Sequence, residues 1–498
     1  MTPKDENIRL LVSLGIAGVM VAGILWLVSK VSPQASNSPR TDSMVSPAVK
    51  ISTSPVSTSP VSSSPEWMSK GEKILVTADK TDEKAAGIKA FNSSDFGTAI
   101  IQFQASLQKQ RNDPETLIYL NNAKVGNSNA LKIAVIAPIG TSLAEAQETL
   151  RGVAQAQEDV NTSGGINGVA LQVEIVSLNN FGQLEQIDNE LVKDSNLLAV
   201  VGFGRNENLY KQNSLVRVSP GSGRSQPGQN QTNALGDSKY VFNISPNRSI
   251  FNQALAEYIV KKQRRTNIAI CRDSSSNNNQ QTSNQERPNQ EVVKEYSDLI
   301  NQAGGKVSST ECDLGAANFR ASDFIAKATS DGAEAILLIP RFSNINPAID
   351  VAKENRGRLA LFGSQQLYSG KVLKFGQGDV KGMVVAVPWH RDANRNMNKG
   401  NSFADRAAKL WGGEVSPRTA TAYDAMQVIV TGLKENKTRQ GLQKVLANPN
   451  FSAMGATGKI QFTPSGDRQG GVFLVKIEPC DPSKPCPSGT GYDFVLVQ

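Results

Sequence analysis

The sequence contains a single histidine among 498 residues, and none of its four cysteines forms a C-x2-C pair. Zinc sites and most acid–base mechanisms need clustered imidazole side chains, so one histidine excludes most of both. That residue, His390, lies in the run Val387-Pro388-Trp389-His390, where we interpret it as a loop or hinge residue. The chain also lacks a G-x-S-x-G motif and a cysteine–histidine pairing. We therefore predict that the protein is not an enzyme and holds no metal or cofactor.

A basic cluster is missing as well. The formal net charge is +8, but lysines and arginines are scattered among acidic residues, and no basic run is interleaved with aromatic residues. Proteins that bind nucleic acids concentrate their positive charge on one face. We therefore expect no nucleic acid among the partners.

The four cysteines all lie in the C-terminal half, and their even number fits disulfides formed in an oxidising compartment. Cys271 ends one apolar strand and Cys312 ends the next expected strand, while Cys480 and Cys486 flank a turn-rich loop. We prefer the pairs Cys271 with Cys312 and Cys480 with Cys486. Four free thiols remain the alternative.

The N-terminus carries the longest apolar run. Residues 10–28 contain no charged side chain, which is long enough for a helix to cross a bilayer. We predict an uncleaved anchor at residues 1–31, with a cleaved signal peptide as the alternative. This interpretation places a single-pass protein in the bacterial inner membrane, with most of the chain in the periplasm or otherwise outside the cytoplasm.

Two further segments precede the main module. Residues 32–65 are dominated by Ser, Pro, Thr and Val and are predicted to be a disordered stalk, because they contain too little apolar surface to fold.

Residues 66–127 show apolar side chains at three- and four-residue steps, such as Phe96, Phe103 and Leu107, which predict helices. This segment resembles one tetratricopeptide unit and the start of a second. A docking piece and a plain helical hairpin packed on its neighbour both remain open.

From residue 131 onward, apolar runs of strand length alternate with helical patterns. The expected strands are 131–137, 171–176, 197–203, 214–219, 266–271, 333–339 and 358–363, and the expected helices are 143–160, 184–195, 249–263, 289–303, 318–330 and 345–356. This alternation predicts an α/β fold whose parallel sheets are covered by helices on both faces.

Several motifs in this module resemble those of the type I periplasmic binding proteins of the leucine/isoleucine/valine-binding kind. They are Ile133-Ala-Val-Ile-Ala-Pro138, Gly164-Gly-Ile-Asn-Gly168, Val200-Val-Gly202, Phe242-Asn-Ile-Ser-Pro246 and Gly455-Ala-Thr-Gly-Lys-Ile-Gln-Phe462. The resemblance implies two doubly wound lobes joined by three crossovers, with a ligand enclosed between them by hinge closure. By position, lobe 1 takes residues 131–247 and 388–455, and lobe 2 takes 248–387 and 456–498. The crossovers are expected near Ser245-Pro246, Val387-Pro388 and Gly455 to Gly458.

The same resemblance implies where the ligand binds. In the family, strand-to-helix turns supply hydroxyl and N–H groups for a ligand carboxylate, and the matching turns here are 202–206 and 220–225. The predicted ligand-binding residues are Ser142, Arg205, Asn206, Gly221, Ser222, Gly223 and Ser225 of lobe 1, and Arg341, Phe342, Gln365 and Gln366 of lobe 2. Gln365 or Gln366 takes the place of the acidic residue that holds an amino group, and an amide does not neutralise an ammonium. Arginines near the expected cleft suit an anion, although solvated rim arginines remain an alternative.

Two functions fit this organisation. The first is the membrane-tethered solute-binding component of an ABC-type importer, which delivers an amino acid, an amide or a small carboxylate to a permease. The second is a non-transport scaffold or regulator of the envelope that reuses the fold to sense or activate a partner, such as a cell-wall synthase. A polar pocket of roughly 300 Å³ or more favours the first, and a sealed cleft favours the second.

Overall fold

The computed structural model describes residues 65–203, 207–222, 240–274, 288–341, 344–393 and 402–497. The predicted anchor at residues 1–31 and the stalk up to residue 64 lie outside these ranges.

The first sheet has six strands in the order β1-β3-β2-β4-β5-β6. Their bounds are β1 Met68–Ser69, β2 Ala130–Ala137, β3 Ala170–Ser177, β4 Leu197–Val201, β5 Val216–Ser222 and β6 Val241–Ser245. All neighbours run parallel except β1, which pairs antiparallel with β3. The sheet and the helices packed on it form what we call the first lobe.

Alternate side chains of the first sheet enter two different cores, as parallel strands buried on both faces require. Ile133 and Val135 pack with α5 (Leu143–Thr162), α15 (Pro417–Glu435) and α16 (Arg439–Leu446). Ala134 and Ile136 face α6 (Leu184–Lys193) and α7 (Glu207–Gln212). The helix α14 (Phe403–Trp411) joins the first of these cores. The long apolar runs seen in the sequence are therefore explained by burial on both sides.

The second sheet has seven strands in the order β15-β14-β11-β10-β9-β7-β8, and it defines the second lobe. The strands from β8 to β11 along this order run parallel, whereas β14 and β15 are antiparallel additions at one edge. Their bounds are β7 Asn267–Arg272, β8 Lys306–Val307, β9 Ala335–Ile339, β10 Ala360–Gly363, β11 Val384–Val387, β14 Phe473–Pro479 and β15 Tyr492–Leu496. Both sheets confirm the predicted α/β class with mainly parallel strands.

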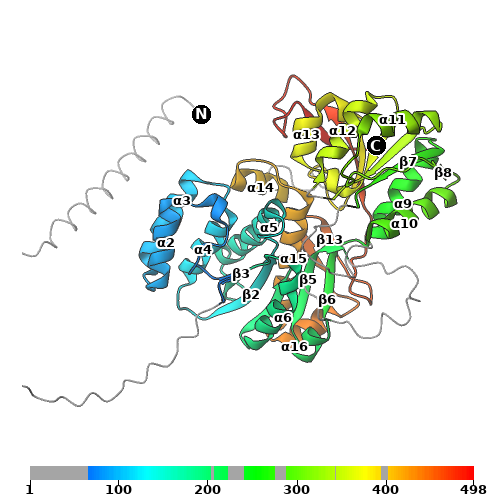
Figure 1. Ribbon diagram of the computed structural model, residues 1–498. Helices are drawn as coiled ribbons and strands as arrows, with labels where there is room; N and C mark the ends of the chain where they lie inside the picture. The colour runs from blue at the N-terminus through cyan, green and yellow to red at the C-terminus, as the bar shows by residue number, and fades with distance from the viewer. Residues whose placement is uncertain are drawn as a thin grey trace, which may run out of the picture. The chain divides into compact units, whose positions relative to one another are not determined.

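Helices cover both faces of the second sheet (Figure 1). One core holds α9 (Arg248–Glu257), its π-helical continuation η3 (Tyr258–Lys262) and α10 (Pro288–Gln302), and the other holds α11 (Ala321–Ser330), α12 (Asn346–Asn355) and α13 (Gly370–Gly376). Strand β9 shows the division, because Leu337 enters the first core and Leu338 the second.

The chain passes between the two sheets after β6, after β11 and after the short hairpin β12 (Ala453–Gly455) and β13 (Gly458–Ile460). The third crossover was expected at Gly455 to Gly458, but these residues form the turn of that hairpin. The turn is fixed to the first lobe, because the buried carboxylate of Asp424 on α15 accepts the Ala456 N–H at 2.5 Å and the Thr457 N–H at 3.2 Å. A Cβ atom on Gly455 would lie 2.1 Å from Asp424 Oδ1, so close packing requires this glycine. The third connecting segment is residues 461–472.

Residues 66–127 form the helices α2 (Asp82–Asn92), α3 (Phe96–Lys109) and α4 (Pro114–Val125) besides strand β1. Every residue of α4 except Lys124 is buried, and the Asn122 side chain bonds the backbone N–H and C=O of Val173 in β3. The segment is thus part of the first lobe's core, as expected for helices packed on their own neighbour.

The cysteines are joined as Cys271 to Cys312 and Cys480 to Cys486, with Cα atoms 4.6 and 5.5 Å apart. The first disulfide links the end of β7 to residue 312, whose carbonyl also accepts the Arg272 N–H. The second closes the loop between β14 and β15.

Candidate ligand-binding site

The strand order of the first sheet marks one place for a ligand. Strand β2 has β3 on one side and β4 on the other, so the chain leaves β2 and later β3 in opposite directions. In open parallel sheets, ligands bind outside the carboxyl ends of the strands at such a switch point. The segments at this point are residues 138–142 after β2 and the turn that begins at Gly202 after β4.

Ser142 lies at this switch point, directly before the twenty residues of α5. Its side chain is half-buried and makes no capping bond to the helix. The first N–H groups of a helix lack intrahelical acceptors, and they favour a negatively charged group. The start of α5 therefore offers a hydroxyl and backbone donors to an anion.

Gly202 brings the turn after β4 against β2. Its φ of +123° is rarely adopted by other residues, and a Cβ atom would lie 2.6 Å from the carbonyl oxygen of Ile136. Further along the sheet, Gly221 and Ser222 end β5, and the Gly221 N–H donates to Ser219 Oγ at 3.2 Å. The predicted site residues Arg205, Asn206, Gly223, Ser225 and Phe342 lie outside the described ranges.

The second sheet has its own switch point at β7, which lies between β8 and β9. Asp273 follows β7 and is fully buried. Its Oδ2 accepts the Arg341 N–H at 3.2 Å and the Asn344 side-chain amide at 3.0 Å. One buried carboxylate therefore fixes the turn after β9, on which Arg341 stands.

Two unpartnered donors lie at the ends of β9 and β10. Arg341 is half-buried, and its guanidinium has no hydrogen bond or ion pair within the described part of the chain. Ser364 Oγ is buried and lacks a partner there as well. Of the two glutamines predicted for this place, Gln365 is exposed and Gln366 half-buried. The sequence prediction missed Asp273 and Ser364, although both directly follow apolar strands, which was the available signal.

A buried polar cluster occupies the second connecting segment, beside neither switch point. His390 is fully buried, its Nε2 lies 3.0 Å from the carbonyl oxygen of Phe494, and its Nδ1 accepts the Asp392 N–H at 3.3 Å. The ring of Tyr368 stacks on Phe494 at 4.2 Å. A neutral imidazole with its proton on Nε2 satisfies both contacts.

This environment predicts a pH dependence of stability. Burial, followed by the charge of Arg391, lowers the pKa of His390 below its ordinary value. The unfolded chain then takes up a proton as the pH falls through about 6.5, while the folded protein does not, so stability present above that pH is lost below it. We expect the free energy of unfolding to fall less between about pH 7.5 and pH 5 in His390→Gln than in the wild type. Urea titrations at each pH measure this, and equal slopes would contradict a neutral buried imidazole.

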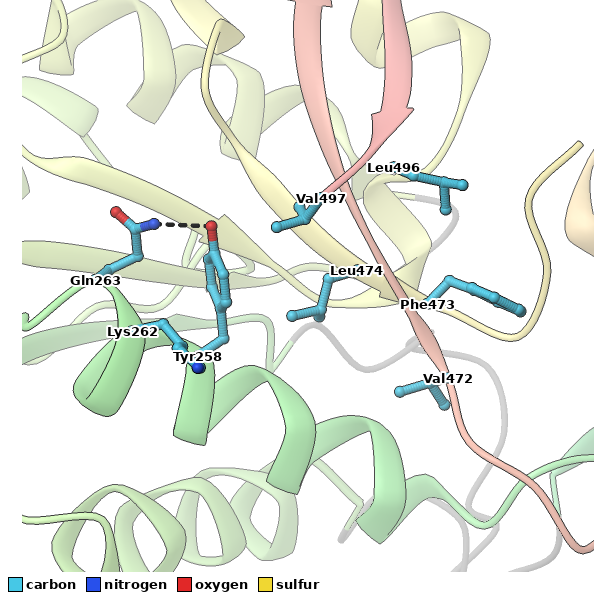
Figure 2. Close-up of a pocket in the computed structure, with 8 residues that line it drawn as sticks. All are labelled: Tyr258, Lys262, Gln263, Val472, Phe473, Leu474, Leu496 and Val497. Atoms are coloured by element: carbon cyan, nitrogen blue, oxygen red, sulfur yellow. Dashed lines mark hydrogen bonds between the residues drawn. The ribbon is translucent and has the colours of Figure 1, made fainter. Parts of the chain in front are cut away.

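A cavity of about 520 Å³ lies elsewhere, on the second lobe between η3 and the ends of β14 and β15. Figure 2 shows the residues that line it and the bond from Gln263 to the Tyr258 hydroxyl. None of the predicted ligand-binding residues lines it. It is therefore not the site that the switch points define.

Two mainly parallel sheets, joined by three segments and each with polar groups at its switch point, define a two-lobed ligand-binding protein. The family model described as periplasmic binding protein matches residues 130–479, and the chain belongs to that family. Members of this family bind ligands and are not enzymes. The match leaves residues 66–127 outside, so the tetratricopeptide resemblance of that segment gains no support.

Solved structures share the fold at low sequence identity. The leucine-binding protein LivK of Thermotoga maritima is 15% identical, with a TM-score of 0.57 over 74% of this chain and 99% of its own. LivJ of Streptococcus pneumoniae, solved with isoleucine, is 16% identical, with a TM-score of 0.57 over 74% and 100%. A solute-binding protein of R. palustris, solved with benzoate, is 14% identical, with a TM-score of 0.56 over 74% and 96%. No curated protein matches the chain.

The predicted location in the inner membrane needs correction. No helix in the ranges that the structure describes is long and apolar enough to cross a bilayer, and the family's fold indicates a periplasmic or extracellular location.

Proposed function

We propose that the protein is the solute-binding component of an ABC-type importer and that it holds a small solute bearing a carboxylate or an amide between its two lobes. The observation that carries this proposal is the presence, at the switch points of both sheets, of polar groups that have no partner among the described residues. Ser142 and the start of α5 provide them in the first lobe, and Arg341 and Ser364 in the second. Each of these groups donates hydrogen bonds, which suits an acceptor-rich solute.

The solved relatives support the same class of solute. Isoleucine and benzoate, the ligands named for two of them, both carry a carboxylate. In this proposal the lobes close on the solute by moving about the three connecting segments. Proline at the first two segments, Pro246 and Pro388, restricts where the backbone turns.

Thermal unfolding of residues 66–498 against a panel of amino acids, small carboxylates, amides and peptides tests the proposal. A solute at about 100 times its dissociation constant stabilises the folded protein by roughly 2.7 kcal/mol, which raises the unfolding temperature by a measurable amount. We expect a shift with one class of carboxylate or amide. No shift with any compound would overturn solute binding for these classes and would favour the scaffold or regulator.

A further inference from the structure

We infer that the second lobe receives an anionic group of the solute at Arg341 and Ser364, so that a carboxylate without an ammonium group is a sufficient ligand. This inference rests on the proposed function and deepens it, because it assigns the chemical class of the solute. It begins from the charges around the switch point at β7.

Both described carboxylates at this switch point already have protein donors. Asp273 is fully buried and accepts from Arg341 N–H and Asn344. Asp313 accepts the N–H groups of Ser274 and Gly315 at 2.8 and 3.0 Å. A solute ammonium, which needs acceptors, would have to compete with these protein donors for the two carboxylates.

The two arginines near this switch point, Arg272 and Arg341, differ in whether they have an ion-pair partner in the described structure. Arg272 at the end of β7 lies 3.9 Å from Asp313, so its charge is compensated within the protein. Arg341 has no such partner in the described ranges, although it is half-buried. A guanidinium that is partly removed from water is stabilised most by a carboxylate, which it binds with paired hydrogen bonds. Among the described residues at this edge of the sheet, the uncompensated charge is therefore positive.

Ser364 provides a second hydrogen-bond donor near Arg341. Gly363 of β10 pairs with Leu338 of β9, and the Ser364 N–H donates to the Leu338 carbonyl at 3.0 Å. These contacts place Ser364 next to the end of β9. Its Oγ is buried without a partner in the described structure, and a buried hydroxyl without a hydrogen bond destabilises the protein. A carboxylate oxygen would accept from this hydroxyl. Asp273 acts as a positioning residue, since it holds the backbone of Arg341 in place.

Matched pairs of compounds separate the two charged ends of the solute. Leucine is compared with 4-methylpentanoate, which lacks only the amino group, and with leucinamide, which lacks only the carboxylate. Phenylalanine, 3-phenylpropanoate and phenylalaninamide form a second set, and benzoate and succinate extend the range of carboxylates. Dissociation constants are measured by calorimetry on residues 66–498, the part that contains both lobes. We expect one of the simple carboxylates to bind at least as tightly as its amino acid, and the amides to bind about 100-fold more weakly.

Three variants then test the residues with the tightest carboxylate found. Arg341→Gln should weaken binding about 10- to 100-fold, Arg341→Lys should restore part of the loss, and Ser364→Ala should weaken binding about 3- to 10-fold. Arg265→Gln is the matched control, because Arg265 is exposed and lies before the amino-terminal end of β7, whereas the proposed site lies at the carboxyl ends of the strands. Its affinity should equal that of the wild type.

The outcomes separate this inference from the proposed function. Binding that requires the amino group, or unchanged affinity in Arg341→Gln, overturns the anion site while solute binding stands. A wild-type protein that binds no compound of the panel overturns both.

Discussion

Replacing Glu115 with alanine is expected to lower the free energy of unfolding by about 3–5 kcal/mol, the usual cost of removing one partner from a buried ion pair. Lys84 of α2 is fully buried, and its Nζ lies 2.8 Å from Asp113 Oδ2 and 2.7 Å from Glu115 Oε2. Burial alone favours the neutral amine, but the charges of Glu115 and Asp113 outweigh it and hold the pKa of Lys84 above its ordinary value. The ammonium therefore stays charged inside the protein and depends on both carboxylates.

Glu115 also accepts hydrogen bonds from neutral donors, and an alanine at this position would leave those donors without a partner. Its Oε1 accepts the Leu75 N–H at 2.7 Å and the Tyr119 hydroxyl at 2.9 Å. Glu115→Gln retains an acceptor for these groups and leaves Lys84 with Asp113, so we expect it to cost about half as much. Urea unfolding measures both changes.

A surface carboxylate provides the matched control. Asp298 pairs with Lys294 on α10, where both side chains are more than half exposed, so Asp298→Ala should change the free energy of unfolding by less than about 1 kcal/mol. A loss below about 1 kcal/mol in Glu115→Ala would show that Lys84 does not depend on this partner.

The elements of the two lobes are predictable because their signals are local. Residues 133–137 form an uninterrupted apolar run, and Asp113-Pro114 combines a capping side chain with a proline suited to the first turn of α4. Each signal operates within a few residues, so no knowledge of the partner strand or helix is needed. The alternation of such elements then indicates the parallel sheets.

The roles of Asp273, Ser364 and Lys84 depend instead on contacts between segments distant in the sequence. Asp273 meets the Arg341 N–H only because β7 pairs with β9, and Lys84 lies 29 residues before Asp113. A lysine in a helix is ordinarily exposed, so its residue type gives no sign of burial. Gly455 and Gly458 show the same difficulty. From the sequence they are compatible with a hinge, but in the structure they form the turn of a hairpin that packs on Asp424.

Replacing Arg391 with methionine should lower the free energy of unfolding by about 3–5 kcal/mol at neutral pH, because two carboxylates lose their shared counter-charge. Arg391 lies in the second connecting segment, and only 12% of its side chain is exposed. Its guanidinium pairs with Glu414, which follows α14 of the first lobe, and reaches Asp493 of β15 in the second lobe at 2.5 Å. One side chain thus connects charged groups of both lobes.

The loss should depend on pH in a way that a simple packing defect would not. Burial already raises the pKa of Glu414, the charge of Arg391 opposes that shift, and Asp493 reinforces it. Without Arg391, the folded-state pKa of Glu414 should rise further above its unfolded value of about 4.3. The destabilisation is then present above the folded-state pKa of Glu414 and decreases as the pH falls toward the unfolded value, where this carboxyl is protonated in either state.

Urea unfolding of Arg391→Met, Arg391→Lys and the wild type between about pH 4.5 and pH 8 measures this dependence. Lysine retains one cation but not the paired geometry, so Arg391→Lys should lose less than the methionine variant. Lys409→Met, on the exposed side of α14, should stay within about 0.5 kcal/mol of the wild type at every pH. A deficit of Arg391→Met that stays constant across this range would attribute its cause to lost packing of the arginine stem rather than to the ionisable groups around it, because packing of the stem does not change with pH.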